Sequence, residues 1–244
     1  MKISIITLFP KMIEGFFNES IIKRAVKKKL VEIEIINLRD FSVDDYGSVD
    51  DRPYGGGAGM ILRIEPIYKA INKITNDALR IKNKNPQSVI RNKIILTSAK
   101  GQVFNQTKAI EYSKLNNLVI IAGHYEGVDE RILDYIDEEI SMGDFVMTGG
   151  EIPAAAIADA IVRLIPGVLK KEEVTIQESF NINGKKLLEY PQYTRPEVFK
   201  GKKVPKILLS GDHKKIEEWR LKKALEETSK KRPDLLDKGK KNPL

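Results

Sequence analysis

The chain has 244 residues, a formal net charge of +8, no cysteine and two histidines. This length is enough for one large domain with a small one and for a sizeable buried core. The lack of cysteine excludes disulfides, thiol nucleophiles and thiolate metal sites, and two histidines argue against an imidazole zinc centre. We therefore predict no bound metal in the protein itself.

The net charge lies in the C-terminal segment. Residues 200–244 carry fifteen Lys and Arg against seven Asp and Glu, whereas the rest of the chain holds 27 of each sign. A solvated basic tail is the simplest interpretation of such a charge run. The alternative is a small basic domain that meets a polyanion such as nucleic acid.

No segment has the character of a targeting or membrane sequence. Residues 1–10 are apolar but shorter than a signal peptide and lack its cleavage site. The longest mostly apolar run, 152–169, is interrupted by Asp159, Arg163 and Pro166. We expect a cytoplasmic protein without membrane contact.

The first third of the chain alternates strand and helix patterns. Residues 2–8 predict a buried strand, and 31–35 a strand in which polar and apolar side chains alternate. A single amphipathic helix is predicted over 11–29, and a polar loop over 44–59 precedes a second helix over 65–80. The apolar positions that indicate the first helix are Ile13, Phe16, Phe17, Ile21 and Val26.

The same alternation continues to about residue 169. Apolar runs at 93–97 and 118–122 predict two buried strands with a short helix between them, and 137–148 is strand-like. A helix is expected to begin after Gly149-Gly150, with Pro153 in its first turn, and to end at Pro166-Gly167. Strands separated by helices predict an α/β domain with a mostly parallel sheet.

The remaining sequence is different in kind. Residues 170–177 are charged and lack a period, so we place an interdomain linker there, between a domain at 1–169 and another at 178–244. The second domain is predicted to be small, basic and mainly helical. Its clearest helix covers 213–228, and Asp212 is placed to cap its free N–H groups.

Glycine-rich segments carry the strongest functional signal. The common nucleotide-binding, hydrolase and metalloprotease motifs are missing from the sequence. Instead, glycines cluster at 54–60, 122–131 and 141–150. Any one cluster is most simply a turn. Two of them at the ends of successive strands predict a single pocket, because ligands of open α/β sheets lie at the carboxyl ends of strands.

Six segments, in order, resemble the bacterial tRNA (guanine-N1)-methyltransferase (TrmD) family: GGGAGM, AGHYEGVDER, SMGDFVMTGGEIP, RLIPGVL, YPQYTRP and LLSGDHKKIEEWRLKKAL. The resemblance covers nearly the whole chain. It implies a SPOUT-type α/β fold with a trefoil knot, which periodicity cannot reveal because unknotted connections are the rule. It also implies a homodimer with active sites shared between subunits, tRNA as substrate, and methyl transfer to N1 of guanine 37 beside the anticodon.

The resemblance further implies S-adenosylmethionine as cofactor and suggests magnesium. The residues it assigns to the cofactor are Gly101, Gly123, Tyr125, Glu126, Met142, Gly143, Asp144, Phe145, Val146, Met147, Gly149 and Gly150. Backbone groups in an apolar slot bind adenine well, and the side chains at 142, 145 and 147 suit such a slot. Plain core packing is the alternative for these three.

Methylation of guanine N1 requires a base for the N1 proton and a cation near O6, where negative charge develops. The resemblance implies Arg163 as the cation and Glu178 as the base. Taken alone, an arginine on an apolar helix can simply snorkel to solvent. The family has Asp-Ser-Phe where this chain has Glu178-Ser179-Phe180, so the carboxylate is one methylene longer. A second departure is TSAKG at 97–101, where the family usually has Ser-Pro-Gln-Gly.

The tRNA contacts implied by the resemblance fall in the 50–59 loop and the C-terminal domain. They are Asp50, Arg52, Gly59, Tyr193, Arg195, His213 and Arg220. Tyr190, Tyr193 and Trp219 are candidates for stacking on unpaired bases, although core packing suits Trp219 equally well.

Two other functions remain open. One is a SPOUT methyltransferase that acts on a ribose hydroxyl, which the pairing of Arg163 with an acid at 178 argues against. The other is a catalytically silent RNA-binding protein, for which the Glu178 substitution leaves room.

Overall fold

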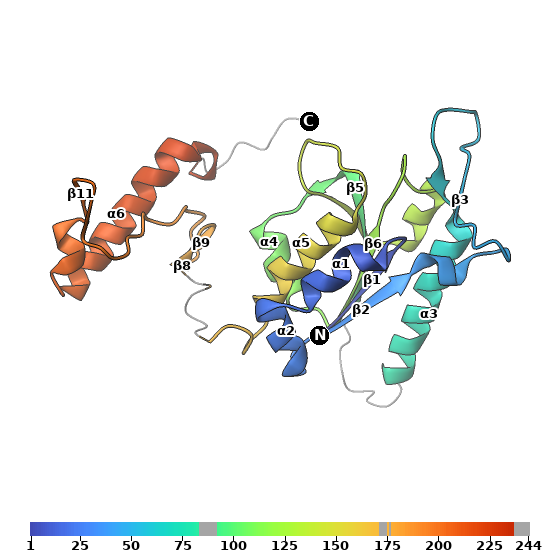
Figure 1. The fold of residues 1–244 in the computed structure, drawn as a ribbon, viewed down its shortest axis with the longest axis horizontal. Coiled ribbons are helices and arrows are strands. Elements are labelled where there is room, and N and C mark those ends of the chain that lie inside the picture. The colour runs from blue at the N-terminus through green and yellow to red at the C-terminus, as the bar shows by residue number, and fades with distance from the viewer. Residues whose placement is uncertain (83–91, 171–174, 176, 237–244) are drawn as a thin grey trace. The chain divides into compact units, whose positions relative to one another are not determined.

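The computed structural model describes the chain except residues 83–91, 171–174, 176 and 237–244, and the side chains of 76–82. The chain divides into two compact units, Met1–Lys170 (unit 1) and Lys171–Leu244 (unit 2). In Figure 1, unit 1 runs from blue to gold and unit 2 from orange to red. Among the described helices, none has both the length and the apolar character needed to cross a membrane.

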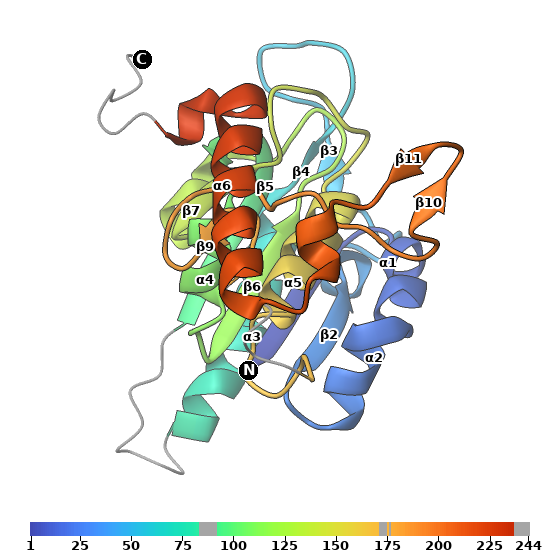
Figure 2. The same ribbon diagram turned by 90° about the vertical axis from the view of Figure 1, so that its left-hand side faces the viewer.

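Unit 1 is organised around a five-stranded sheet of order β2-β1-β6-β5-β7. Figure 2 labels four of these strands, β2, β6, β5 and β7. Every pair in the sheet is parallel, which confirms the predicted α/β class. The strands are β1 (Lys2–Thr7), β2 (Glu32–Asn37), β5 (Asn92–Val103), β6 (Asn117–Ala122) and β7 (Glu138–Ser141). The strand expected over 137–148 is wrong beyond 141. Residues 142–149 form a loop, in which Gly143 has a φ of +134°.

Helices cover both faces of this sheet, as Figure 1 shows. Successive strand residues point to opposite faces, so Ile5 and Ile120 enter one core and Ile6 and Ile121 the other. The first core is shared with α1 (Pro10–Phe17), α2 (Ser20–Lys27), α4 (Gln106–Tyr112) and α5 (Glu151–Val162). The second is shared with α3 (Ile64–Lys82) and the short helices η1 (Leu38–Phe41) and η2 (Glu130–Tyr135).

The predicted helix over 11–29 is wrong, because two helices occupy this stretch. Asn18 caps the end of α1, and Ser20 has a left-handed φ of 54°. This break rotates the second helix relative to the first, so the apolar period does not continue across it. Phe16 and Val26 are therefore exposed, and Ala25 is buried instead.

Two further boundaries differ from expectation. The polar loop over 44–59 contains a short strand, β3 (Asp50–Asp51), which pairs antiparallel with β4 (Ile61–Leu62). Helix α5 begins directly after Gly150, as predicted, but ends at Val162, before Pro166-Gly167.

Unit 2 contains one long helix, α6 (His213–Lys231), and two small hairpins among its described residues. The hairpins are β8 (Gln177–Glu178) with β9 (Asn181–Ile182), and β10 (Val198–Phe199) with β11 (Lys202–Lys203). Short helices η4 (Lys206–Leu209) and η5 (Pro233–Leu235) flank α6. Asp212 caps α6 as predicted, since its Oδ1 accepts from the Lys215 N–H at 3.2 Å.

Candidate active site

A cavity of about 290 Å³ opens at the carboxyl ends of β5, β6 and β7. Most of the residues that the sequence assigns to a cofactor line it: Gly123, Tyr125, Glu126, Met142, Phe145, Val146, Met147, Gly149 and Gly150. Gly101, Gly143 and Asp144 do not line it. The two glycine-rich segments that the sequence predicts to form one pocket therefore do meet.

Strand β5 contributes a further wall of the cavity, in the stretch 97–101 where the resemblance assigns Gly101 to the cofactor. Ile140 of β7 lies opposite both Thr97 and Gln102, so residues 98–101 leave the ladder and form an arch, the β5 arch. Ser98, Ala99 and Lys100 of this arch line the cavity. Gly101 serves the sheet, because a Cβ there would lie 2.4 Å from the Glu139 carbonyl carbon.

The floor of the cavity is fastened by short polar contacts. The Gly150 N–H donates to the Gly123 carbonyl at 2.6 Å, and the Gly123 N–H donates to Thr97 Oγ1 at 3.1 Å. A Cβ on Gly150 would lie 1.9 Å from Thr97 Oγ1 and 2.7 Å from the Gly123 nitrogen. Glycine at 150 is thus required by contacts within the protein, whereas the sequence suggested ligand approach as the reason.

A buried acid lies beside this floor. Glu151, the first residue of α5, is fully buried, and its Oε1 accepts from Thr7 Oγ1 at 2.8 Å. Its Oε2 lies 3.4 Å from Nδ1 of His124, which lines the cavity. The sequence indicated Glu151 only as a favourable helix-start acid, and neither it nor His124 was predicted as a site residue.

The outer edge of the cavity is apolar and open. Phe145, Val146 and Met147 are exposed, so core packing is wrong for the side chains at 145 and 147. Met142 is half-buried and packs against the first core. Tyr125 has a left-handed φ of 58°, a conformation uncommon for a bulky residue and often found at ligand sites.

The 54–60 loop is attached to the cavity by backbone bonds. The Glu126 N–H donates to the Met60 carbonyl at 3.1 Å, and the Leu62 N–H donates to the Gly127 carbonyl at 2.9 Å. A Cβ on Gly59 would lie 2.5 Å from Glu126 Cγ, so these two predicted residues are in contact. Asp50 and Arg52 belong to the same attached segment, since Asp50 pairs with Leu62.

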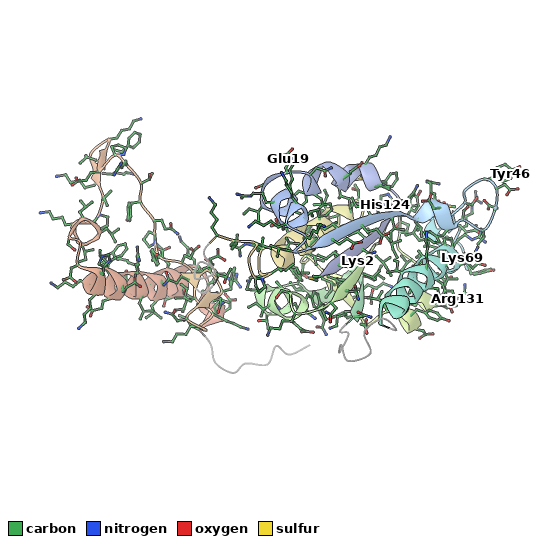
Figure 3. All side chains as sticks on the ribbon, turned by 90° about the horizontal axis from the view of Figure 1, so that it is seen from below. Lys2, Glu19, Tyr46, Lys69, His124 and Arg131 are labelled. Atoms are coloured by element: carbon green, nitrogen blue, oxygen red, sulfur yellow. The ribbon has the colours of Figure 1, made fainter. Side chains whose placement is uncertain are left out.

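Two tyrosines of this region extend into solvent. Tyr46 is 95% and Tyr54 103% exposed. Figure 3 shows Tyr46 at the extremity of unit 1. Their full exposure suits contact with a large partner.

Two ionic contacts of unit 1 lie in or near the lining of the cavity. Lys100 and Glu130 form an exposed ion pair at 3.2 Å across its lining, which contributes little to stability. Glu138, the first residue of β7, accepts hydrogen bonds from Lys108, Lys93 and Tyr112. Burial raises the pKa of Glu138, but these bonds outweigh burial and lower the pKa to about 2.

Among the described residues, no three His, Cys, Asp or Glu side chains gather as metal ligands.

Neither of the two predicted catalytic residues lines the cavity. Arg163 lies elsewhere in unit 1, and Glu178 belongs to unit 2. Pro153 of α5 lines the cavity, whereas Arg163 caps the far end of α5, about 15 Å farther along the helix axis. Glu178 is half-buried in the β8–β9 hairpin of unit 2 and lies opposite Asn181. The structure therefore does not place Arg163 in the lining of the cavity.

The residues of unit 2 predicted to bind RNA differ in their surroundings. Tyr193, Arg195 and His213 are exposed. Arg220 is half-buried, donates to Glu217 at 2.5 Å, and stacks over Tyr190 at 5.0 Å. Trp219 is half-buried.

Comparison with known proteins identifies the family of the chain. The family model described as tRNA (Guanine-1)-methyltransferase TrmD matches residues 1–238. A tRNA (guanine-N(1)-)-methyltransferase of Dictyoglomus turgidum is 50% identical over 98% of this chain and 91% of the relative. Another, from Clostridium beijerinckii, is 52% identical over 98% and 93%, and one from Endomicrobium trichonymphae is 46% identical over 98% and 100%. The chain belongs to the tRNA (guanine-1)-methyltransferase family.

Proposed function

We propose that this protein transfers a methyl group from S-adenosylmethionine to N1 of guanine 37 in tRNA. The observation that carries the proposal is the cavity at the ends of β5, β6 and β7, which is lined by nine of the twelve residues that the family resemblance assigns to the cofactor. The near full-length similarity to relatives named for this reaction supports it.

The residues of the cavity fit the cofactor. A volume of about 290 Å³ is close to the lower range of small-molecule sites, roughly 300 Å³. Leu96, Leu133 and Met142 offer apolar contact for a purine, and the backbone at 123–127 and 147–150 offers polar groups. When bound, S-adenosylmethionine supplies a methyl group on a positively charged sulfur.

The chain's own catalytic work falls to two side chains. Glu178 accepts the proton of guanine N1, and Arg163 stabilises the negative charge that develops on O6.

A homodimer completes the site. Its support is the position of Arg163, about 15 Å along α5 from the cavity-lining Pro153, because a second copy can supply this side chain. The trefoil knot is supported by membership of the family alone.

The tRNA is held by half-buried Asp50 and exposed Arg52 and Gly59 of unit 1, and by the exposed residues Tyr193, Arg195 and His213 of unit 2. Arg220 orders Tyr190 for the same surface. Magnesium, where it takes part, is held mainly by RNA phosphates and water, and we place the reaction in the cytoplasm.

Methyl transfer to two tRNA transcripts, with guanine or adenine at position 37, tests the function. We expect 1-methylguanosine only in the first. Glu178→Gln is expected to lower kcat at least a hundredfold, with the Kd of tRNA and of cofactor unchanged. Glu197→Gln, at an exposed acid of the same unit, is the matched control and should keep full activity.

Two outcomes would replace the proposal. Methyl transfer to a ribose hydroxyl, irrespective of the base, would establish the other type of SPOUT methyltransferase. Tight binding of both ligands without any transfer would establish a silent RNA-binding protein.

Mixed dimers test the shared site. Arg163→Ala and a variant with a closed cavity, Gly150→Ala, are each expected to be inactive alone. If Arg163 acts on the partner's cavity, an equal mixture regains about a quarter of the wild-type sites, since half of the dimers are mixed and each has one intact site. Lack of recovery, with mixed dimers shown by mass spectrometry, would place both functions in one chain.

A further inference from the structure

Two buried polar atoms beside the cavity face each other without hydrogen bonds. These atoms are Glu151 Oε2 and His124 Nδ1, and both lack a hydrogen-bond partner among the described residues. They are 3.4 Å apart. The acid is fully buried and the imidazole largely so, with 1% and 15% of the two side chains exposed.

Such a pair needs a proton between its two atoms. Burying a carboxylate oxygen or a ring nitrogen without a partner is costly. Glu151 Oε1 already accepts a hydrogen bond from Thr7 Oγ1. Thr7 Oγ1 in turn accepts from the Phe9 N–H at 2.9 Å. The one arrangement that satisfies both remaining atoms with an ionised glutamate is a hydrogen on Nδ1 that is donated to Oε2.

We propose that Glu151 is a positioning residue that fixes His124 in the Nδ1–H tautomer. In the neutral ring, Nε2 then carries a lone pair and acts as an acceptor. Since His124 lines the cavity, this acceptor serves an N–H or O–H of the bound ligand. The ligand part of this inference rests on the proposed function, in which amine and hydroxyl groups of S-adenosylmethionine are such donors.

The surroundings hold the imidazole in one orientation. The rings of Phe9 and Tyr125 lie on it, each with its centroid 4.8 Å from that of His124. The Glu151–His124 contact lies against Gly149, where a Cβ would be 2.3 Å from Glu151 Oε2 and 2.4 Å from His124 Nδ1. Glycine at 149 thus leaves room for the acid and the imidazole to meet.

The tautomer can be measured without any ligand. The chain has two histidines, and His213 is exposed, so ¹⁵N-histidine NMR of the whole protein gives two ring patterns. His213→Gln assigns them. We expect the Nδ1–H pattern for His124 at pH 7.5, and a change to Nε2–H in Glu151→Gln, whose amide donates to Nδ1. An Nε2–H pattern in the wild-type protein, or one unchanged by Glu151→Gln, would overturn the proposal.

Cofactor affinity tests the ligand role. Glu151→Gln is expected to raise the Kd of S-adenosylmethionine, measured by calorimetry, about 10- to 100-fold. His124→Gln keeps an acceptor near the place of Nε2, whereas His124→Asn keeps a polar group only near Nδ1. We therefore expect the glutamine variant to bind more tightly than the asparagine variant. Near-equal Tm values for the variants would show that folding is not the cause.

The two measurements separate the possible failures. An Nδ1–H tautomer with unchanged affinity in Glu151→Gln would overturn the ligand role and leave the proposed function standing. Absence of S-adenosylmethionine binding in the wild-type protein would instead refute the proposed function, while the tautomer result still decides the role of Glu151 towards His124.

Discussion

The polar groups of the two units differ in where they find partners. Around the cavity of unit 1, Thr7, Thr97 and Glu151 are buried and bonded to other parts of the same unit. In unit 2, the predicted RNA contacts Tyr193 and Arg195 are exposed. A small cofactor can be bound by a pre-organised site, whereas a long polyanion supplies the partners of exposed cations itself. The difference predicts distinct responses to salt, substitution and pH.

The largest difference between the two units is expected in how their binding affinities depend on salt concentration. Between 50 and 200 mM salt we expect the Kd of tRNA to rise about a thousandfold, and that of the cofactor to change little. Replacing Lys200, Lys202 and Lys203 by glutamine should lower the slope of log K against log salt by about two. A triple change of exposed lysines in α1 and α2, at Lys11, Lys23 and Lys27, is the control. Equal slopes for both triple variants would contradict an RNA-binding role for the β10–β11 hairpin.

Among glycine-to-alanine substitutions near the cavity, Gly150→Ala is expected to have the largest effect on cofactor binding and stability. The added carbon would lie 1.9 Å from Thr97 Oγ1 of β5 and 2.7 Å from the Gly123 nitrogen, which follows β6, so the start of α5 must move away from both strands. We expect loss of cofactor binding and a decrease of about 3 kcal/mol in the free energy of unfolding. Calorimetry and urea unfolding measure the two effects.

Gly15→Ala is the matched control for this substitution. Gly15 lies in α1, and a Cβ there meets nothing within 4 Å. We expect this variant to gain about 0.5 to 1 kcal/mol of stability through helix propensity and to bind the cofactor normally. Normal cofactor affinity in Gly150→Ala would show that the floor contact is dispensable.

Glu138 makes the stability of unit 1 dependent on pH. Its pKa is lowered from 4.5 to about 2 in the folded protein, so its stabilising contribution is complete above pH 4.5 and is lost as pH falls towards 2. Glu138→Gln should cost about 2 kcal/mol at pH 7. The difference from wild type should shrink between pH 4.5 and pH 2, which unfolding curves at several pH values would show. A constant difference would contradict the ionised state of this carboxyl.

The smallest effect is expected at the start of α6. Asp212→Ala removes the acceptor for the Lys215 N–H and should cost about 1 kcal/mol of stability. Cofactor affinity should stay unchanged, because Asp212 belongs to unit 2. A change in cofactor Kd would show that the two units are coupled.

Sequence patterns predicted those parts of the molecule that depend on neighbours along the chain. The parallel sheet followed from its apolar runs, and the cavity segments at 122–131 and 141–150 followed from contiguous glycine-rich motifs. The break at Asn18 was not predicted, because the apolar residues on both sides mimic one helical period.

Features that depend on distant segments could not be predicted. The β5 arch exists because Ile140 of another strand pairs on both sides of it, and no local pattern encodes that register. The burial of Glu151 could not be predicted from local patterns, since its contacts Thr7 and His124 come from remote parts of the chain. The roles of Arg163 and Glu178 rest on the family resemblance and await the experiments above.

The β5 arch also has an evolutionary consequence. Thr97 and Gln102 share one partner on β7, so the residues between them are not paired with that strand. Insertions or deletions between Ser98 and Lys100, which line the cavity, are therefore expected to change the cavity more than the sheet. Ligand preference can therefore change at residues 98–100 with little effect on folding. Engineered loops are best placed at the same residues.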